Sequence, residues 1–139
     1  MHVAPTPKAN AMLICDYVIT EKTTNKKSLI GIFENIGAAH FPCRHNSLSV
    51  YVKLTEAHGS YRFRLELMDL KNYVSIGKTE MPQDIPIDNP LTSYQLVFNL
   101  NGLQFAHPGE YEFRIFANDK IFGQKSFVVS EIIEGEGDR

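Results

Sequence analysis

The stretch that decides the fold is LSVYVKLTEAHGSYRFRLEL, which runs from Leu48 to Leu67. Apolar and polar residues alternate on both sides of its centre. A period of two is typical of a strand with one buried face and one face in water. A two-residue turn at His58-Gly59 places the apolar residues of both halves on the same face. We therefore predict a β-hairpin that pairs Leu54 with Phe63, Val52 with Leu65 and Val50 with Leu67.

Similar strand-like segments recur along the chain, and no stretch of ten or more residues has the period of a helix. The first of them, Met12–Thr20, is nearly continuous in apolar residues, which predicts burial on both faces apart from Asp16. The predicted strands are Met12–Thr20, Leu29–Ile36, the two halves of the hairpin, Val74–Glu80, Tyr94–Leu100, Tyr111–Ala117 and Phe122–Val129.

Three connections are longer than hairpin turns, and each contains proline, which interrupts both ladders and helices. Short hairpins joined by a few long crossings are typical of two packed sheets. We predict an all-β fold, an antiparallel Greek-key β-sandwich of the immunoglobulin-like class with about seven or eight strands. A closed barrel is the alternative. The long connections are Gly37–Ser47, Met81–Ser93 and Asn101–Gly109.

The chain of 139 residues has the length of one domain. We predict a flexible N-terminal lead over residues 1–10, a β-sandwich domain over 11–130 and an acidic C-terminal tail over 131–139. The lead has no basic segment followed by an apolar one, so it is no secretory signal, and we expect a cytoplasmic protein. No apolar run approaches the roughly 18 residues of a membrane helix, so no membrane association is expected.

Fourteen basic and sixteen acidic residues give a net charge of −2, which argues against nucleic acid as a partner. Two cysteines are too few for a disulfide scaffold. A disulfide bond between Cys15 and Cys43 is one alternative, although two reduced thiols are the state expected in a cytosol. We expect no cofactor.

PGEYEFRIFAND, residues Pro108–Asp119, resembles the entry to the sixth strand of immunoglobulin-like and fibronectin-like domains. A tyrosine near the start of that strand anchors a corner there, through a hydrogen bond back to the preceding backbone. The resemblance implies that Tyr111 has this role.

The chain from about residue 9 to 129 also resembles a bacterial family of domains of unknown function. The resemblance lies in ANAMLICDYVI, SLIGIFENI, FPCRH, LSVYVKLT, FNLNG and PGEYEFRIFANDKIFGQK. It implies a small all-β domain and assigns no catalytic or binding residue.

A candidate metal or redox site lies in the segment HFPCRH, where His40, Cys43 and His45 are potential ligands within six residues. Cys15 would complete a tetrahedral set. The spacing matches no standard zinc pattern, however, and a long loop with solvated histidines is the simpler interpretation.

Two further sets of residues are candidates for binding. The predicted hairpin places Lys53 opposite Arg64 with Arg62 nearby, and such a basic patch would attract an anion or an acidic partner unless Glu66 or a neighbouring strand compensates it. Tyr51, Phe116 and Phe122 are candidate exposed aromatic anchors for a protein contact.

The sequence lacks a G-x-S-x-G nucleophile motif and a glycine-rich phosphate loop, so we do not expect an enzyme. It does not identify a ligand or a substrate. The favoured hypothesis is a non-catalytic protein-binding or assembly module, acting through a protein partner or self-association. A metal or redox protein and an anionic-ligand-binding β-sandwich remain the alternatives.

Overall fold

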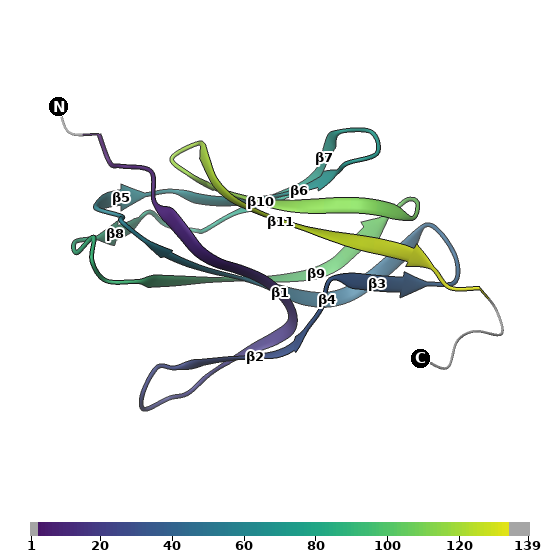
Figure 1. The fold of residues 1–139 in the computed structure, drawn as a ribbon, viewed down its shortest axis with the longest axis horizontal. Coiled ribbons are helices and arrows are strands. Elements are labelled where there is room, and N and C mark those ends of the chain that lie inside the picture. The colour runs from purple at the N-terminus through teal and green to yellow at the C-terminus, as the bar shows by residue number, and fades with distance from the viewer. Residues whose placement is uncertain (1–2, 134–139) are drawn as a thin grey trace.

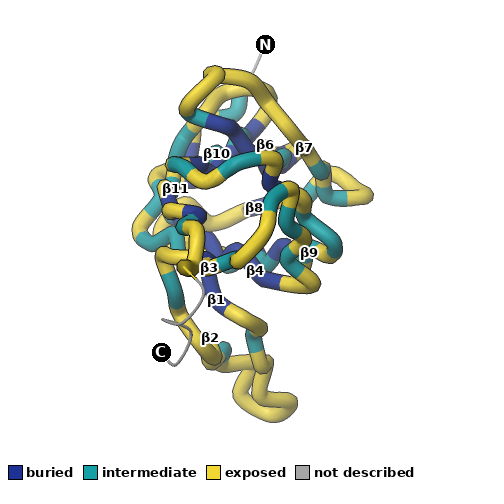
Figure 2. The backbone as a smooth tube through the Cα atoms, turned by 90° about the vertical axis from the view of Figure 1, so that its right-hand side faces the viewer, coloured by how far each residue is buried: buried dark blue, intermediate teal, exposed yellow. Residues whose placement is uncertain are grey.

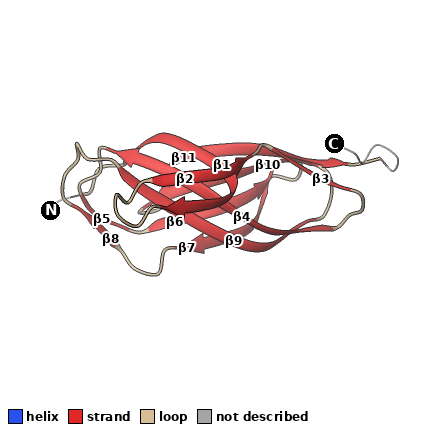
Figure 3. Cartoon of the chain, turned by 90° about the horizontal axis from the view of Figure 1, so that it is seen from below, coloured by secondary structure: helices blue, strands red, loops and turns tan. Residues whose placement is uncertain are grey.

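The computed structural model describes residues 3–133, which fold into two β-sheets packed face to face (Figure 1). Within this range the regular structure consists of strands alone, as predicted (Figure 3). No helix in the described chain has the length and apolarity to cross a bilayer. The strands are β1 (Lys8–Thr20), β2 (Lys27–Ile32), β3 (Asn35–Ala38), β4 (Cys43–Thr55), β5 (Gly59–Tyr61), β6 (Phe63–Asp69), β7 (Val74–Glu80), β8 (Ile85–Ile87), β9 (Tyr94–Phe105), β10 (Gly109–Ala117) and β11 (Lys120–Glu131).

The strand order identifies the topology. One sheet has the order β2-β1-β4-β9 and the other β3-β11-β10-β6-β7, while β5 and β8 form a small ribbon at one end. All pairs are antiparallel except β3 with β11. Without β2 and β3, the order β1-β4-β9 facing β11-β10-β6-β7 corresponds to strands A-B-E and G-F-C-C′ of an immunoglobulin domain. The predicted Greek-key sandwich is therefore confirmed.

The predicted hairpin within Leu48–Leu67 is wrong. β4 pairs with β1 and β9, whereas β6 pairs with β10 and β7 in the opposite sheet. Glu56 takes a φ of 61° and Gly59 a φ of 133°, and the chain crosses from one sheet to the other instead of folding back. Val52 thus pairs with Leu96 and Met12, not with Leu65.

The predicted inward-facing residues are nevertheless correct. Val50, Val52 and Leu54 on β4 and Phe63, Leu65 and Leu67 on β6 are all buried, so the two strands contribute to one core from opposite sides. Fully burying one such side chain contributes about 1.5–3 kcal/mol.

An aromatic cluster joins the two sheets. Phe105 comes from β9 of the four-stranded sheet, and its ring lies 4.8 Å from that of Tyr111 and 5.8 Å from that of Phe127, both in the five-stranded sheet. The Tyr111 hydroxyl donates a hydrogen bond of 2.6 Å to the carbonyl of His107, which confirms the tyrosine corner.

The short strands β5 and β8 were not predicted from the sequence as separate strands, and the predicted strand Leu29–Ile36 is divided between β2 and β3, which belong to different sheets. β8 contains Pro86 and pairs only with the equally short β5, and β3 lies at a sheet edge. β4 begins already at Cys43 and β9 continues to Phe105, so two of the proline-bearing connections are shorter than predicted.

The N-terminal lead is also shorter than predicted. β1 begins at Lys8, which pairs with Thr55, and the Tyr61 hydroxyl donates a hydrogen bond of 2.7 Å to the Pro5 carbonyl. Residues 8–10 therefore belong to the sheet. Residues 1–2 of the predicted lead and residues 134–139 of the predicted tail lie outside the described range.

Candidate functional site

The second half of β1 and the whole of β2 form a hairpin arm, Asp16–Ile32, that projects from the sandwich (Figure 1). Figure 2 shows the arm at the bottom of the molecule, coloured mostly as exposed. β2 is an edge strand, because its only strand partner in residues 3–133 is β1. One row of its backbone amides and carbonyls is therefore open to another strand.

A tight turn closes the arm at its tip. The Glu21 amide donates to the Lys26 carbonyl at 2.7 Å, and Asn25 takes the left-handed φ of 60° that such turns require. The Thr24 amide donates to the Glu21 carboxylate at 2.5 Å, and the Thr24 hydroxyl donates to the same oxygen. These hydrogen bonds from Thr24 lower the pKa of Glu21.

Gly31 allows the two strands to approach near the base of the arm. Its φ is +70°, and a Cβ at this position would collide with the Asp16 carboxylate. Only glycine satisfies both conditions without strain.

One face of the arm is apolar. Tyr17 pairs with Ile30, and Ile32 pairs with Cys15, so these side chains lie on the same side of the ribbon as Ile19. We call Tyr17, Ile19, Ile30 and Ile32 the arm face; they are 52%, 48%, 37% and 55% exposed. Large exposed apolar patches are uncommon on monomeric proteins and mark contact sites.

The turn beyond the arm face carries net positive charge. Lys22, Lys26 and Lys27 accompany a single acid, Glu21, in the segment Glu21–Lys27. The exposed apolar face thus ends in a basic tip, which favours an acidic group on whatever covers it.

The predicted aromatic anchors are not exposed. Tyr51 is only 8% exposed on the outer side of the four-stranded sheet, where its hydroxyl donates to Gln95. Phe116 points outward but lies beneath the Arg64 guanidinium, 4.3 Å from the ring centre. Phe122 packs against the core, with its ring 6.0 Å from that of Phe63. Tyr51 and Phe116 thus face outward but are covered, and Phe122 faces the core, so the expectation of exposed aromatic anchors is wrong.

The predicted basic patch is also not assembled. Lys53 pairs with Ala11 and Gln95 in one sheet, while Arg64 lies in the other. Arg64 contacts Glu66 at 2.9 Å and Asp119 at 2.6 Å. Arg62 lies 3.7 Å from Asp84. Carboxylates therefore compensate both arginines, and the juxtaposition of Lys53 with Arg64 was wrong because the hairpin was wrong.

The potential metal ligands are dispersed. His40 is exposed, Cys43 packs against the core, and the His45 ring lies 5.9 Å from the Phe33 ring. Cys15 is fully buried, and both cysteines are free thiols. Burial raises the pKa of the Cys15 thiol, which makes it less reactive. Across the described part of the chain, no three His, Cys, Asp or Glu residues form a group that could hold a metal ion.

A histidine–aspartate pair at the tyrosine corner was not recognised in the sequence. His107 Nε2 lies 2.7 Å from Asp69 Oδ2, and Nδ1 lies 2.7 Å from the Pro108 carbonyl oxygen. Both partners accept hydrogen bonds, so both nitrogens donate, which requires the protonated imidazolium. The Pro108 carbonyl and Asp69 accordingly raise the pKa of His107. A ring with no free lone pair cannot act as a general base, and the pair stabilises the corner.

The arm face was not among the binding sites predicted from the sequence. The apolar run Met12–Thr20 was interpreted as a strand buried on both faces, which is correct only for Ile14 and Cys15. The signal available in the sequence was a nearly continuous apolar run that leads directly into a turn with three lysines.

The fold and the projecting arm define the class: an immunoglobulin-like β-sandwich with an exposed apolar hairpin. Residues 10–130 match the profile of a family described as "Family of unknown function (DUF6941)", and the chain belongs to this family. The resemblance to a family of unknown function is thus confirmed. No curated protein matches the sequence.

Solved structures share the fold at low sequence identity. The alkylpurine DNA glycosylase AlkC of Pseudomonas fluorescens, bound to DNA containing an abasic site analog, has a TM-score of 0.54 and 7% identity over 89% of this chain and 30% of its own. An immunoglobulin-like protein from Pseudomonas aeruginosa has a TM-score of 0.47 and 14% identity, and the match covers 88% of this chain and 95% of that protein. A Listeria innocua beta-glucosidase has a TM-score of 0.48 and 9% identity, and the match covers 91% of this chain and 17% of the enzyme. This chain therefore spans only a part of the two enzymes, and the likeness concerns the fold alone.

Proposed function

We propose that this protein is a non-catalytic binding module that holds another protein through the arm face and the free edge of β2. The observation that supports this function is the exposure of four large apolar side chains, Tyr17, Ile19, Ile30 and Ile32, on one side of a projecting ribbon. Keeping them in water is unfavourable unless a partner covers them.

The geometry also indicates the chemistry of the partner. An open strand edge binds an extended segment by backbone hydrogen bonds, and alternate side chains of that segment then lie on the arm face. The lysines at the tip favour acidic residues at one end of that segment. The partner we propose is therefore an extended strand with alternating apolar residues and an acidic flank.

The test compares two double variants. Ile30→Lys with Ile32→Lys places charges on the arm face, and Val74→Lys with Ile76→Lys makes the same change on the exposed edge strand β7. We expect a synthetic strand peptide with alternating valines and a glutamate flank to bind the wild type and the β7 variant. The arm variant should bind at least about tenfold more weakly in fluorescence anisotropy.

Sedimentation over a range of concentrations shows whether a second copy occupies the arm. A dimer that the arm variant abolishes and the β7 variant keeps would support assembly through the same face. Equal peptide binding by all three proteins, or a strict monomer with no peptide binding, would refute the proposal.

A further inference from the structure

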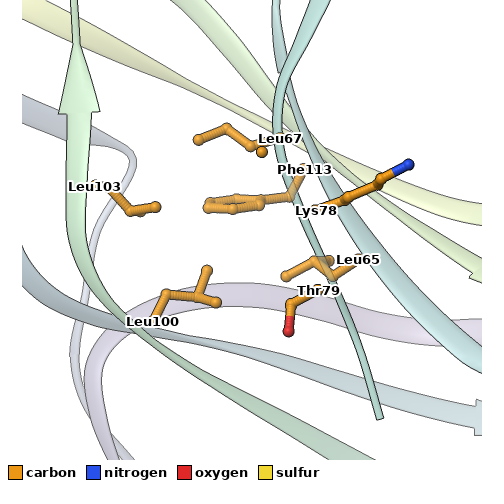
Figure 4. A pocket seen from close by; sticks show the side chains of 8 residues that line it. Leu65, Leu67, Lys78, Thr79, Leu100, Leu103 and Phe113 are labelled. Carbon is orange, nitrogen blue, oxygen red and sulfur yellow. The ribbon is translucent and has the colours of Figure 1, made fainter.

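The two sheets separate along one side of the sandwich, where β7 and β9 are the edge strands. A cavity of about 160 Å³ opens there (Figure 4). Leu65, Leu67 and Phe113 line it from the five-stranded sheet, and Leu100 and Leu103 line it from β9.

The cavity exists because β7 contributes no apolar side chain at this level. Gly77 pairs with Leu67, so a side chain at position 77 would point to the same inner side as Leu67. A Cβ on Gly77 would meet no atom within 4 Å. The register shift between Leu67 and Met68 leaves Ile76 unpaired, and that side chain is 42% exposed.

The walls determine which molecules fit. They are made mostly of leucine and phenylalanine side chains, and β7 adds Gly77, Lys78 and Thr79. Figure 4 shows the Lys78 ammonium group pointing away from the Phe113 ring. An apolar protein cavity of about 150 Å³ is large enough for benzene. A charged group among the leucine and phenylalanine side chains would lose its hydration without gaining a partner, because the Lys78 ammonium group points away from them.

We propose that the cavity between β7 and β9 is a binding site for a small uncharged molecule about the size of one aromatic ring. The lining of this cavity contains no residue of β1 or β2, so this proposal can be tested independently of the proposed binding by the arm.

Methyl-labelled leucines allow a direct test by NMR. Toluene added to the wild type should shift the methyl signals of Leu65, Leu67, Leu100 and Leu103 saturably, and benzoate, which has the same ring and a charge, should not. Gly77→Leu fills the cavity and should weaken toluene binding at least about tenfold. The matched control is Ser75→Leu on the same strand, which pairs with Met68 on the outer side and should keep binding within about twofold.

Leu103→Phe places a larger side chain on the opposite wall of the cavity. It provides a second variant with a filled cavity if Gly77→Leu does not fold. No saturable shift in the wild type would overturn the proposal. Equal binding of toluene and benzoate would do the same, as would undiminished binding in folded blocked variants.

Discussion

His107 shows at the residue scale how ionisation can stabilise a corner of the sandwich. Its imidazolium donates to Pro108 and Asp69, and these contacts raise its pKa. Burial of Asp69 opposes ionisation, but hydrogen bonds from His107 and from the Lys71 and Asn72 amides outweigh it and lower the pKa of Asp69. The contacts at the corner thus favour the charged form of both groups.

The sign of each shift determines the pH dependence. The His107 contribution is complete below its unfolded pKa of about 6.5 and is lost as the pH rises through the higher folded value. The Asp69 contribution is complete above its unfolded pKa of about 3.9 and is lost as the pH falls through the lower folded value. Both are complete between about pH 4 and 6.5.

His107→Gln should therefore lower the free energy of unfolding by about 1–2 kcal/mol at pH 5.5 and by less at pH 9. Urea denaturation at both pH values measures this difference. The control is His40→Gln, which changes a histidine exposed in a loop and should have little effect at either pH. A loss at His107 that does not change with pH would contradict the assignment.

At the scale of the elements, the arm depends on a single glycine at its base. Gly31→Ala introduces a Cβ where φ is +70° and the Asp16 carboxylate is in the way. We expect a loss of about 1–2 kcal/mol and faster hydrogen exchange of the β1–β2 amides beyond Cys15.

The matched control for this change is Gly77→Ala, because the new Cβ meets no atom within 4 Å there. Its free energy of unfolding should stay within about 0.5 kcal/mol of the wild type. Similar losses for the two variants would show that the close approach at Asp16 does not matter.

The elements also show which parts of the fold the sequence could predict. The alternation of Tyr111–Ala117 identified the buried face correctly, because the direction of a side chain is a local property of a strand. In Tyr94–Leu100 it was correct for Leu96 and Phe98, whereas Tyr94 at the strand end is 36% exposed. Which strands pair is not local. The apolar faces of β4 and β6 fit equally well side by side in one sheet or opposite each other across a core, and the structure has the second arrangement.

At the scale of the whole molecule, Phe105 crosses from the four-stranded sheet to the rings of the other sheet. Phe105→Ala should cost about 3–5 kcal/mol and destabilise both sheets together. Urea denaturation followed by circular dichroism and by tyrosine fluorescence should give coincident transitions at a lower midpoint.

Phe116→Ala removes a ring of the same size from the outer side, where the Arg64 guanidinium lies over it, and should cost clearly less. A loss below about 1 kcal/mol at Phe105, or two separate transitions, would contradict the joining role of this ring.

The candidate site depends on the same global arrangement, so the sequence predicted little of it. Whether Tyr51 or Phe122 is exposed depends on what covers it, and whether Lys53 meets Arg64 depends on strand pairing. The apolar residues of the arm were visible in the sequence. Their exposure was not, because it results from β1 and β2 extending beyond the sheets.

The arm is tied into the molecule at both ends. β1 continues from it into the four-stranded sheet along β4, and β3 follows it and lies parallel to β11 in the five-stranded sheet. A force applied to the tip along β1 is therefore transmitted to the β1–β4 and β3–β11 ladders. The hydrogen bonds of each ladder must then break together by shear and not one after another. A protein bound to the arm would therefore be mechanically connected to both sheets of the sandwich.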